Sequence, residues 1–265
     1  MIRVAVSGAT GRMGSEVCRA VAAADDLELV AAVSPSHAGR RLGDVVTGLD
    51  GDAAGLELAG DLGAVTAAGA DVCVEFSRPP HGGPNTLALL EAGVHAVVGT
   101  TGITAEELDR IGDAATAGAA RALVAPNFAI GAVLLMQLSA QVARHLPHVE
   151  IVELHHDGKA DAPSGTALRT AELVAAARRE APDAPAGDDA HPGARGADVA
   201  GVRVHSVRLP GLVAHQEVLF GGDGETLSIR HDSIDRRGFM PGVLLGVRRV
   251  AGLDGLVVGL EHLLD

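Results

Sequence analysis

A short segment of the chain combines side chains that can move protons with a helix start that can bind an anion. It contains the imidazoles of His155 and His156 and the amine of Lys159, and it ends in Ser164-Gly165-Thr166 before an apolar run. Imidazole and amine groups exchange protons in catalysis. The first N–H groups of a helix have no partner inside the helix and attract negative charge. We therefore predict a reaction site for a small carboxylic acid, held in part by Gly165 and Thr166.

The two histidines are adjacent at the end of a predicted strand, so their side chains should point to opposite faces. A metal ion bound by both is not expected, and the chain has neither a His-x-x-x-His pair nor a cysteine cluster. We therefore predict no metal site. A lone histidine would be interpreted as structural, but two histidines followed by Lys159 and a Ser-Gly-Thr helix start favour a functional role.

A second ligand is indicated near the beginning of the chain by Gly8, Gly11 and Gly14. These glycines follow an apolar run at 2–6 and open a helical pattern, a context typical of a loop that binds the pyrophosphate of a dinucleotide. A simple tight turn is the alternative interpretation. The end of the second strand reads Val33-Ser34-Pro35-Ser36-His37, without the carboxylate that usually binds the ribose of NAD, while Arg40 and Arg41 follow. This pattern favours NADPH and leaves NADH open.

Alternating strands and helices must position this loop. Helical stretches at 84–92 and 104–117 separate apolar runs, and Thr104 with Glu107 forms a predicted capping box. This alternation predicts a Rossmann-like, doubly wound parallel sheet, with ligands at the carboxyl ends of its strands. The predicted strands are 2–6, 27–33, 71–76, 94–98 and 122–125.

The pattern changes after Pro126 and predicts a second, α+β domain with a mostly antiparallel sheet. Its predicted helices are 128–146 and 164–180, and its predicted strands are 149–154, 202–209, 215–220 and 226–231. Residues 181–193 are rich in Pro, Gly and Asp and are predicted to form an exposed loop. We expect an αβ unit at 241–250 and 256–264 to pack on the first domain. The predicted domains are therefore 1–126 with 237–265, which binds the dinucleotide, and 127–236, which binds the substrate.

Composition excludes several classes of function. The chain has a formal net charge of -13 and no Trp or Tyr, so it lacks the basic clusters and stacking side chains of nucleic-acid binding proteins. The longest apolar stretch, 128–138, is shorter than the ~20 residues that span a bilayer. No signal peptide is recognised at the start, and Cys18 and Cys73 occur in apolar settings typical of buried thiols. We expect a cytoplasmic protein without membrane or nucleic-acid partners.

Four motifs together closely resemble the 4-hydroxy-tetrahydrodipicolinate reductase family, also called dihydrodipicolinate reductase, of lysine and diaminopimelate synthesis. The most specific is Glu153-x-His-His-x-x-Lys-x-Asp-x-Pro-Ser-Gly-Thr-Ala167, and the supporting motifs are Gly8-Ala-Thr-Gly-Arg-Met-Gly14, Val98-Gly-Thr-Thr-Gly102 and Ala125-Pro-Asn-Phe128. The resemblance covers essentially the whole chain. It implies reduction of a small cyclic dicarboxylate by NADPH or NADH, and a homotetramer assembled through the sheet of the second domain.

The resemblance also implies the roles of individual residues. His155 would be the acid/base residue and Lys159 the proton donor, while His156, Lys159, Gly165 and Thr166 would hold the substrate carboxylates. Ser34 departs from the family, because many relatives have an acidic residue there, and this leaves the choice of cofactor open. The implied cofactor site comprises Gly8, Ala9, Thr10, Gly11, Arg12, Met13, Ser34, Arg78, Gly99, Thr100, Thr101, Ala125, Pro126, Asn127 and Phe128.

Two rival functions are weighed against this one. Another two-domain Rossmann oxidoreductase, such as a sugar or semialdehyde dehydrogenase, would need a catalytic cysteine in a loop or a Glu-Lys-Pro string, and neither is found. A nucleotide sensor that has lost the reaction would bind the cofactor without consuming it, and intact His155, His156 and Lys159 argue against that. Arg195, Gly196, His215, Glu217 and Arg236 receive no role from the sequence.

Overall fold

The computed structural model describes residues 1–180 and 190–264, which divide into two compact units. Unit 1 comprises Met1–Phe128 and Phe239–Asp265, and unit 2 comprises Ala129–Gly238. Unit 1 is therefore built from both ends of the chain, with unit 2 inserted between them. Among the described residues, no helix is long and apolar enough to cross a membrane.

Unit 1 is organised around a seven-stranded sheet in which every pairing is parallel. The strand order is β12-β6-β5-β4-β1-β2-β3, so the chain reverses its direction of winding after β3, as in a doubly wound sheet. The central strands are mostly apolar because helices cover both faces. The strands are β1 (Ile2–Ser7), β2 (Leu27–Val33), β3 (Leu58–Ala59), β4 (Val72–Glu75), β5 (His95–Val98), β6 (Ala122–Val124) and β12 (Leu256–Val258).

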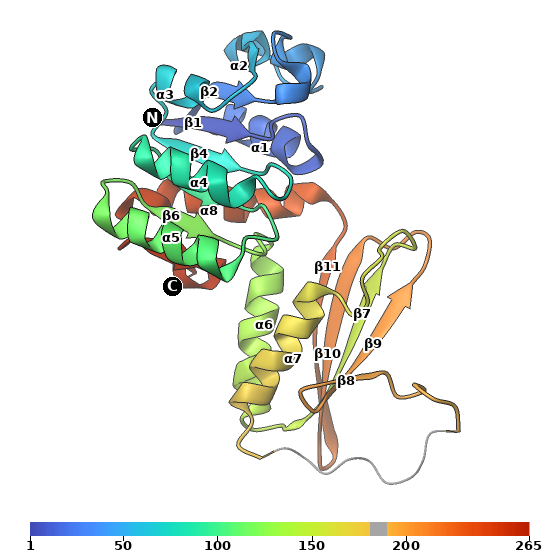
Figure 1. Cartoon of the computed structure of the whole chain (residues 1–265). Coiled ribbons are helices and arrows are strands. Elements are labelled where there is room, and N and C mark those ends of the chain that lie inside the picture. The colour runs from blue at the N-terminus through green and yellow to red at the C-terminus, as the bar shows by residue number, and fades with distance from the viewer. Residues whose placement is uncertain (181–189, 265) are drawn as a thin grey trace. The chain divides into compact units, whose positions relative to one another are not determined.

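The helices of unit 1 form a layer on each face of this sheet (Figure 1). Side chains of α3, α4 and α5 share one buried apolar cluster with the sheet, while α1 and α8 pack together on the other face. An ion pair between Arg248 on α8 and Asp26, 222 positions apart, connects the two ends of the chain at 2.7 Å. The helices are α1 (Arg12–Ala22), α2 (Gly51–Gly55), α3 (Gly63–Ala67), α4 (Gly82–Glu91), α5 (Ala105–Ala117) and α8 (Met240–Arg249).

Unit 2 has a five-stranded sheet in the order β11-β10-β7-β9-β8, with helices α6 and α7 against one face (Figure 1). Three of its four strand pairings are antiparallel, and only β7 with β9 is parallel. That pairing is possible because α7 supplies the crossover between the two strands. The elements are α6 (Ile130–Ala143), β7 (His148–His155), α7 (Gly165–Ala177), β8 (Ala197–Val199), β9 (Val202–Arg208), β10 (Ala214–Gly222) and β11 (Glu225–Ser233).

The predicted fold class is confirmed: a Rossmann-like parallel sheet and a second unit with a mostly antiparallel sheet. The capping box at Thr104 and Glu107 is present. Four short elements, α2, α3, β3 and β8, are not predicted, because two to five residues are too few to show a period. The predicted helices at 128–146 and 164–180 are several residues too long. Most of the predicted loop at 181–193 lies outside the described residues.

Candidate functional site

Five loops of unit 1 begin where parallel strands end, and they contain all the predicted cofactor residues. Residues 8–13 follow β1, Ser34 follows β2, Arg78 belongs to the loop after β4, 99–101 follow β5, and 125–128 follow β6. Because the strands are parallel, these loops share one edge of the sheet. The fold therefore brings together residues that are up to 120 positions apart in the sequence (8 to 128).

The first glycine of the loop after β1 has no room for a side chain. Gly8 has a φ of +76°, and a Cβ atom there would lie 2.5 Å from the carbonyl oxygen of Phe76. The backbone N–H groups of Gly8 and Ala9 both donate to the carbonyl of Val33 at 3.0 Å. Helix α1 begins after Gly11 with no side-chain cap and no acidic residue in its first turn. This is the arrangement that accepts a pyrophosphate at a helix N-terminus, so the loop fits a dinucleotide.

Phe76 joins three of these loops, although the sequence does not predict it as a site residue. Its carbonyl faces Gly8, and its ring occupies the space that a side chain at Gly99 would need. The ring also packs on Phe128, with ring centroids 5.8 Å apart. The ends of β1, β4, β5 and β6 therefore meet at a single residue, through its backbone carbonyl and its ring.

Glu75, the last residue of β4, is completely buried and organises the same edge. Its carboxylate accepts the backbone N–H of Ser77 at 2.7 Å and the side-chain amide of Asn85 at 3.1 Å. The hydroxyl of Thr100 lies 3.2 Å from the same carboxylate. These bonds fix the start of the loop that contains Arg78 and the loop that contains Thr100. Arg78 itself is exposed.

The end of β2 is a cluster of hydroxyl groups around an imidazole. Ser34 is buried, and its Oγ lies 2.7 Å from the Oγ1 of Thr10 in the glycine loop. The Nδ1 of His37 lies 3.0 Å from the Oγ of Ser36 and 3.2 Å from that of Thr10. Arg40 and Arg41 are exposed. The cluster of Thr10, Ser34, Ser36 and His37 contains no carboxylate, so none of its four side chains repels a phosphate.

In unit 2, His155 ends β7 beside a buried carboxylate. Glu153 is completely buried, and its Oε2 contacts the Nδ1 of His155. Arg208, at the end of β9, binds both oxygens of Glu153, at 2.8 and 3.0 Å. Burial lowers the pKa of His155, an effect that Lys159 and Arg208 reinforce and that Glu153 opposes. The imidazole is therefore neutral over a wider range of pH than an exposed histidine.

Lys159 lies on the loop after β7 and is held by Asp161. Its Nζ contacts Oδ1 at 2.7 Å and Oδ2 at 2.8 Å, and the hydrogen bond to Lys159 lowers the pKa of Asp161. The Lys159 side chain is 21% exposed. An ammonium group has three N–H donors, so two are directed to Asp161 and a third remains for another acceptor.

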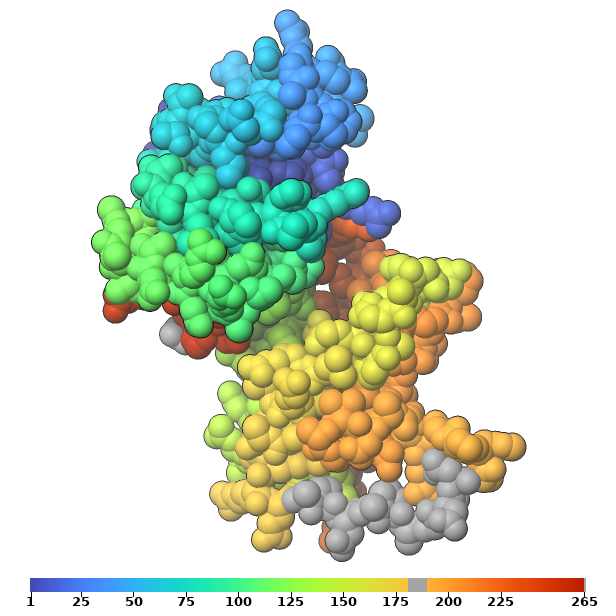
Figure 2. All heavy atoms as spheres, viewed as in Figure 1, coloured from blue at the N-terminus to red at the C-terminus, as the bar shows by residue number. Residues whose placement is uncertain are grey.

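Helix α7 begins immediately after this loop. Ser164 is the N-cap, and its Oγ accepts the N–H of Ala167 at 3.2 Å. The first turn contains no acidic residue, and a Cβ atom at Gly165 would meet nothing within 4 Å. His156 is exposed on the segment after β7, the yellow-green surface of unit 2 in Figure 2. His155, Lys159, Gly165 and Thr166 are thus confined to one strand end, one loop and one helix start.

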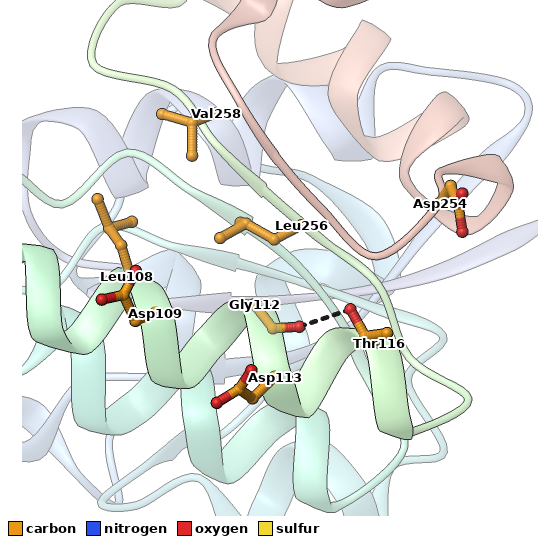
Figure 3. A pocket seen from close by; sticks show the side chains of 8 residues that line it. All are labelled: Leu108, Asp109, Gly112, Asp113, Thr116, Asp254, Leu256 and Val258. Atoms are coloured by element: carbon orange, nitrogen blue, oxygen red, sulfur yellow. Dashed lines mark hydrogen bonds between the residues drawn. The ribbon is translucent and has the colours of Figure 1, made fainter.

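A separate pocket of about 500 Å³ lies between α5 and β12 in unit 1 (Figure 3). It contains none of the predicted site residues. Its lining includes Asp109, Asp113 and Asp254, but in the part of the chain that the structure describes no group of three His, Cys, Asp or Glu residues could hold a metal ion. The pocket is lined by Leu108, Asp109, Gly112, Asp113, Thr116, Asp254, Leu256 and Val258.

Comparison with known proteins gives one consistent family. A model described as dihydrodipicolinate reductase, N-terminus, matches residues 2–128, and the corresponding C-terminus model matches residues 131–264. The 4-hydroxy-tetrahydrodipicolinate reductases of Nocardia farcinica and Streptomyces griseus are 54% and 53% identical to this chain, over all of it and over 99% and 98% of their own lengths. A solved structure, dipicolinate-bound dihydrodipicolinate reductase from Paenisporosarcina sp. TG-14, is 39% identical, with a TM-score of 0.88 and both chains fully covered.

Proposed function

Since the chain belongs to the dihydrodipicolinate reductase family, we propose that His155 and Lys159 are its catalytic residues and that unit 1 binds the cofactor. The protein is an oxidoreductase that reduces 4-hydroxy-tetrahydrodipicolinate to tetrahydrodipicolinate with NADPH or NADH in lysine and diaminopimelate biosynthesis. The observation that best supports the residue assignment is the grouping of His155, Lys159 and the α7 N-terminus around one loop.

The reaction defines what these residues must do. The substrate loses water to give a conjugated cyclic imine. Bound NAD(P)H would supply the hydride that reduces the ring, and a proton is then added to the enamine that results. The net change consumes one NAD(P)H and one proton and releases water. The protein must bind two carboxylates, exchange protons at the ring, and keep water from the reacting atoms.

We assign the substrate carboxylates to His156, Lys159, Gly165 and Thr166. The positive end of α7, which has no acidic residue in its first turn, and the remaining N–H of Lys159 support this assignment, because both favour a carboxylate oxygen. Lys159 is the proton donor to the enamine. His155 is the acid/base residue, because burial keeps its imidazole neutral and able to take up a proton.

We assign the cofactor to the loops at the carboxyl edge of the parallel sheet. The pyrophosphate would bind residues 8–13, with the N-terminus of α1 directed at it, and the loops 99–101 and 125–128 would hold the nicotinamide half. Ser34 with Thr10 would face the ribose of the adenosine half, and Arg78 would lie at the rim of the site. Position 34 is a serine and not the acidic residue that would bind the ribose of NAD, so we propose that NADPH is preferred over NADH.

The test is oxidation of NADPH and, separately, of NADH by the purified protein, with the substrate made in place by its synthase from pyruvate and aspartate semialdehyde. We expect oxidation that depends on the synthase, with a higher kcat/KM for NADPH. Cofactor binding without oxidation would instead indicate a nucleotide sensor. Oxidation that is equally fast without the synthase would indicate a different substrate.

We also propose a homotetramer that assembles through the sheet of unit 2, and a cytoplasmic location. On β10, Val218 and Phe220 are buried, while the alternate residue Leu219 is 38% exposed on the opposite face. A contact between copies on this face would cover Leu219. A soluble cofactor and substrate support the location. Light scattering should give four times the mass of one chain, and Leu219→Glu should lower it.

A further inference from the structure

Glu153 is a completely buried carboxylate in the catalytic unit whose role the assignments above leave open. A buried charge is costly unless it is paired and hydrogen-bonded. Glu153 precedes His155 by two residues in β7, so both side chains lie on the same face of the sheet. The parallel register sets His155 opposite Arg208 and Glu153 opposite Ser206. The sheet therefore holds the imidazole, the carboxylate and the guanidinium together through its backbone.

The contacts of Glu153 stabilise its buried carboxylate in the ionised form. Arg208 forms a two-pronged pair with the carboxylate, and the Nδ1 of His155 contacts Oε2. Burial alone would raise the pKa of Glu153, but hydrogen bonds from Arg208, Ser206 and His155 hold it below the ordinary value. The carboxylate is therefore ionised at neutral pH.

An ionised carboxylate can only accept hydrogen bonds, so the His155 nitrogen beside it must be the donor. This assigns the proton of neutral His155 to Nδ1 and leaves the lone pair on Nε2. We infer that Glu153, held by Arg208, is the positioning residue that fixes the tautomer of His155, so that the proton exchanged during reduction enters and leaves at Nε2. This inference rests on the proposed catalytic role of His155.

Arg208 extends this arrangement to the loop that contains the catalytic amine. Its NH2 group donates to the backbone carbonyl of Asp161 at 2.6 Å, and the side chain of Asp161 holds Lys159. One guanidinium thus connects the carboxylate behind His155 with the residue that holds Lys159. The acid/base residue and the proton donor are positioned by a single chain of bonds.

The test compares Glu153→Gln with the parent enzyme in the synthase-coupled assay. A glutamine keeps the size of the side chain but can donate to Nδ1, which would favour the wrong tautomer. We expect kcat to fall by roughly 100-fold to 1,000-fold, within the range of general acid/base catalysis, with the KM for NADPH unchanged. The limb of the kcat/KM profile that titrates with His155 should move to lower pH, because the carboxylate no longer favours the imidazolium.

A matched control exists on the same strand. Glu150 also pairs with a histidine, His205, at 2.8 Å, but Glu150 is exposed, His205 is half-buried, and Glu150 lies five residues before His155 in β7. Glu150→Gln should leave kcat and the pH profile unchanged. In a His155→Ala background, Glu153→Gln should cause no further loss of kcat, because a positioning residue acts only through the residue that it positions. Full additivity of the two losses would overturn the inference.

An activity-independent measurement separates this inference from the proposed function. The 15N chemical shifts of the His155 imidazole report which nitrogen is protonated. We expect Nδ1–H in the parent protein and a change of tautomer in Glu153→Gln. If the parent fails to oxidise NADPH, the proposed function is wrong, whereas an Nε2–H tautomer in an active parent overturns the role of Glu153. Should Glu153→Gln not fold, Arg208→Lys keeps the ionised carboxylate but removes the two-pronged bond that orients it. It should retain Nδ1–H and still lower kcat, and an unchanged kcat would overturn the role of Arg208.

Discussion

Gly14 on α1 lies against the carbonyl group of Gly8, so closely that a Cβ atom at residue 14 would overlap the oxygen and lie 2.8 Å from the carbonyl carbon. The helix can approach the end of β1 only because residue 14 has no side chain. The direction of the α1 N-terminus toward the glycine loop depends on this contact.

Gly14→Ala should therefore weaken cofactor binding by about tenfold or more and lower the free energy of unfolding by about 1–3 kcal/mol, the usual cost of overpacking. Titration of NADPH fluorescence and urea unfolding measure the two effects. Gly112→Ala on α5 is the matched control, because the nearest atom to its Cβ would be an ordinary 3.7 Å away. It should leave cofactor binding intact, and an equal loss in both variants would disprove the argument.

Lys159→Ala should lower kcat by about 100-fold to 10,000-fold, since it removes the proposed proton donor. The affinity for NADPH should stay nearly unchanged, because the cofactor residues belong to unit 1. Stopped assays for kcat and fluorescence titration for NADPH measure the two quantities. Equal loss of both would show that Lys159 is needed for the fold of the site.

Asp161→Asn tests how much the ion pair with Asp161 contributes to the function of the Lys159 amine. It removes the carboxylate that holds Lys159 at 2.7 Å but keeps the amine. We expect a loss of kcat of less than about tenfold, because the amine is still present but less well oriented. A loss as large as that of Lys159→Ala would assign the main role to the ion pair.

Ser34→Asp should change the choice between the two cofactors. The new carboxylate would lie near the hydroxyl of Thr10 and repel the 2′-phosphate of NADPH, while it could accept bonds from the ribose of NADH. We expect the ratio of kcat/KM for NADPH to that for NADH to fall by at least about tenfold. An unchanged ratio would place recognition of the phosphate elsewhere, with Arg40 and Arg41 the next residues to change.

The stability of unit 1 should fall in mild acid because of His95. Its Nδ1 accepts the backbone N–H of Arg121 at 2.9 Å, and burial, together with the charge of Arg121, lowers its pKa despite the opposing Asp71. Below the ordinary histidine pKa, near 6.5, the unfolded chain binds a proton that the folded chain still excludes. The free energy of unfolding therefore decreases as the pH falls through that value.

Urea unfolding at pH 7.5 and 5.5 measures this loss. His95→Gln should reduce the difference between the two pH values, because glutamine cannot take up the proton. His145→Gln, at an exposed position, should show the same difference as the parent. An identical difference in His95→Gln would exclude His95 as a source of the acid sensitivity.

The fold of unit 1 could be predicted because its signals are local. The strand at Leu27–Val33 is apolar apart from Glu28, and the helix at Ala105–Ala117 starts at a capping box, so both are found within a residue of their predicted bounds. The pairing of β7 with β9 could not be predicted, since no local pattern states which strands become neighbours across a crossover helix.

The sequence could identify a residue of the candidate site only where that residue belongs to a recognisable motif. The roles assigned to His155, Lys159 and the glycine loop stay predictions. Phe76 and Arg208 were missed because their contacts depend on chain segments 50 or more residues away, such as Phe128 and Glu153. Glu153 had a usable signal: it stands two positions before His155 in a predicted strand, and the period of two puts both side chains on one face.

The insertion of unit 2 within unit 1 has a consequence for synthesis of the chain on the ribosome. Strand β12 completes the parallel sheet, and helix α8 completes the helix layer that it forms with α1. Both are made after all of unit 2. Until then β6 is an edge strand without its neighbour β12, and Asp26 lacks its ion-pair partner Arg248. Unit 2 is one continuous segment and can fold as a unit before the C-terminal part of unit 1 is made. The cofactor-binding unit is thus the last part of the protein to mature, although its glycine loop is the first motif to be made.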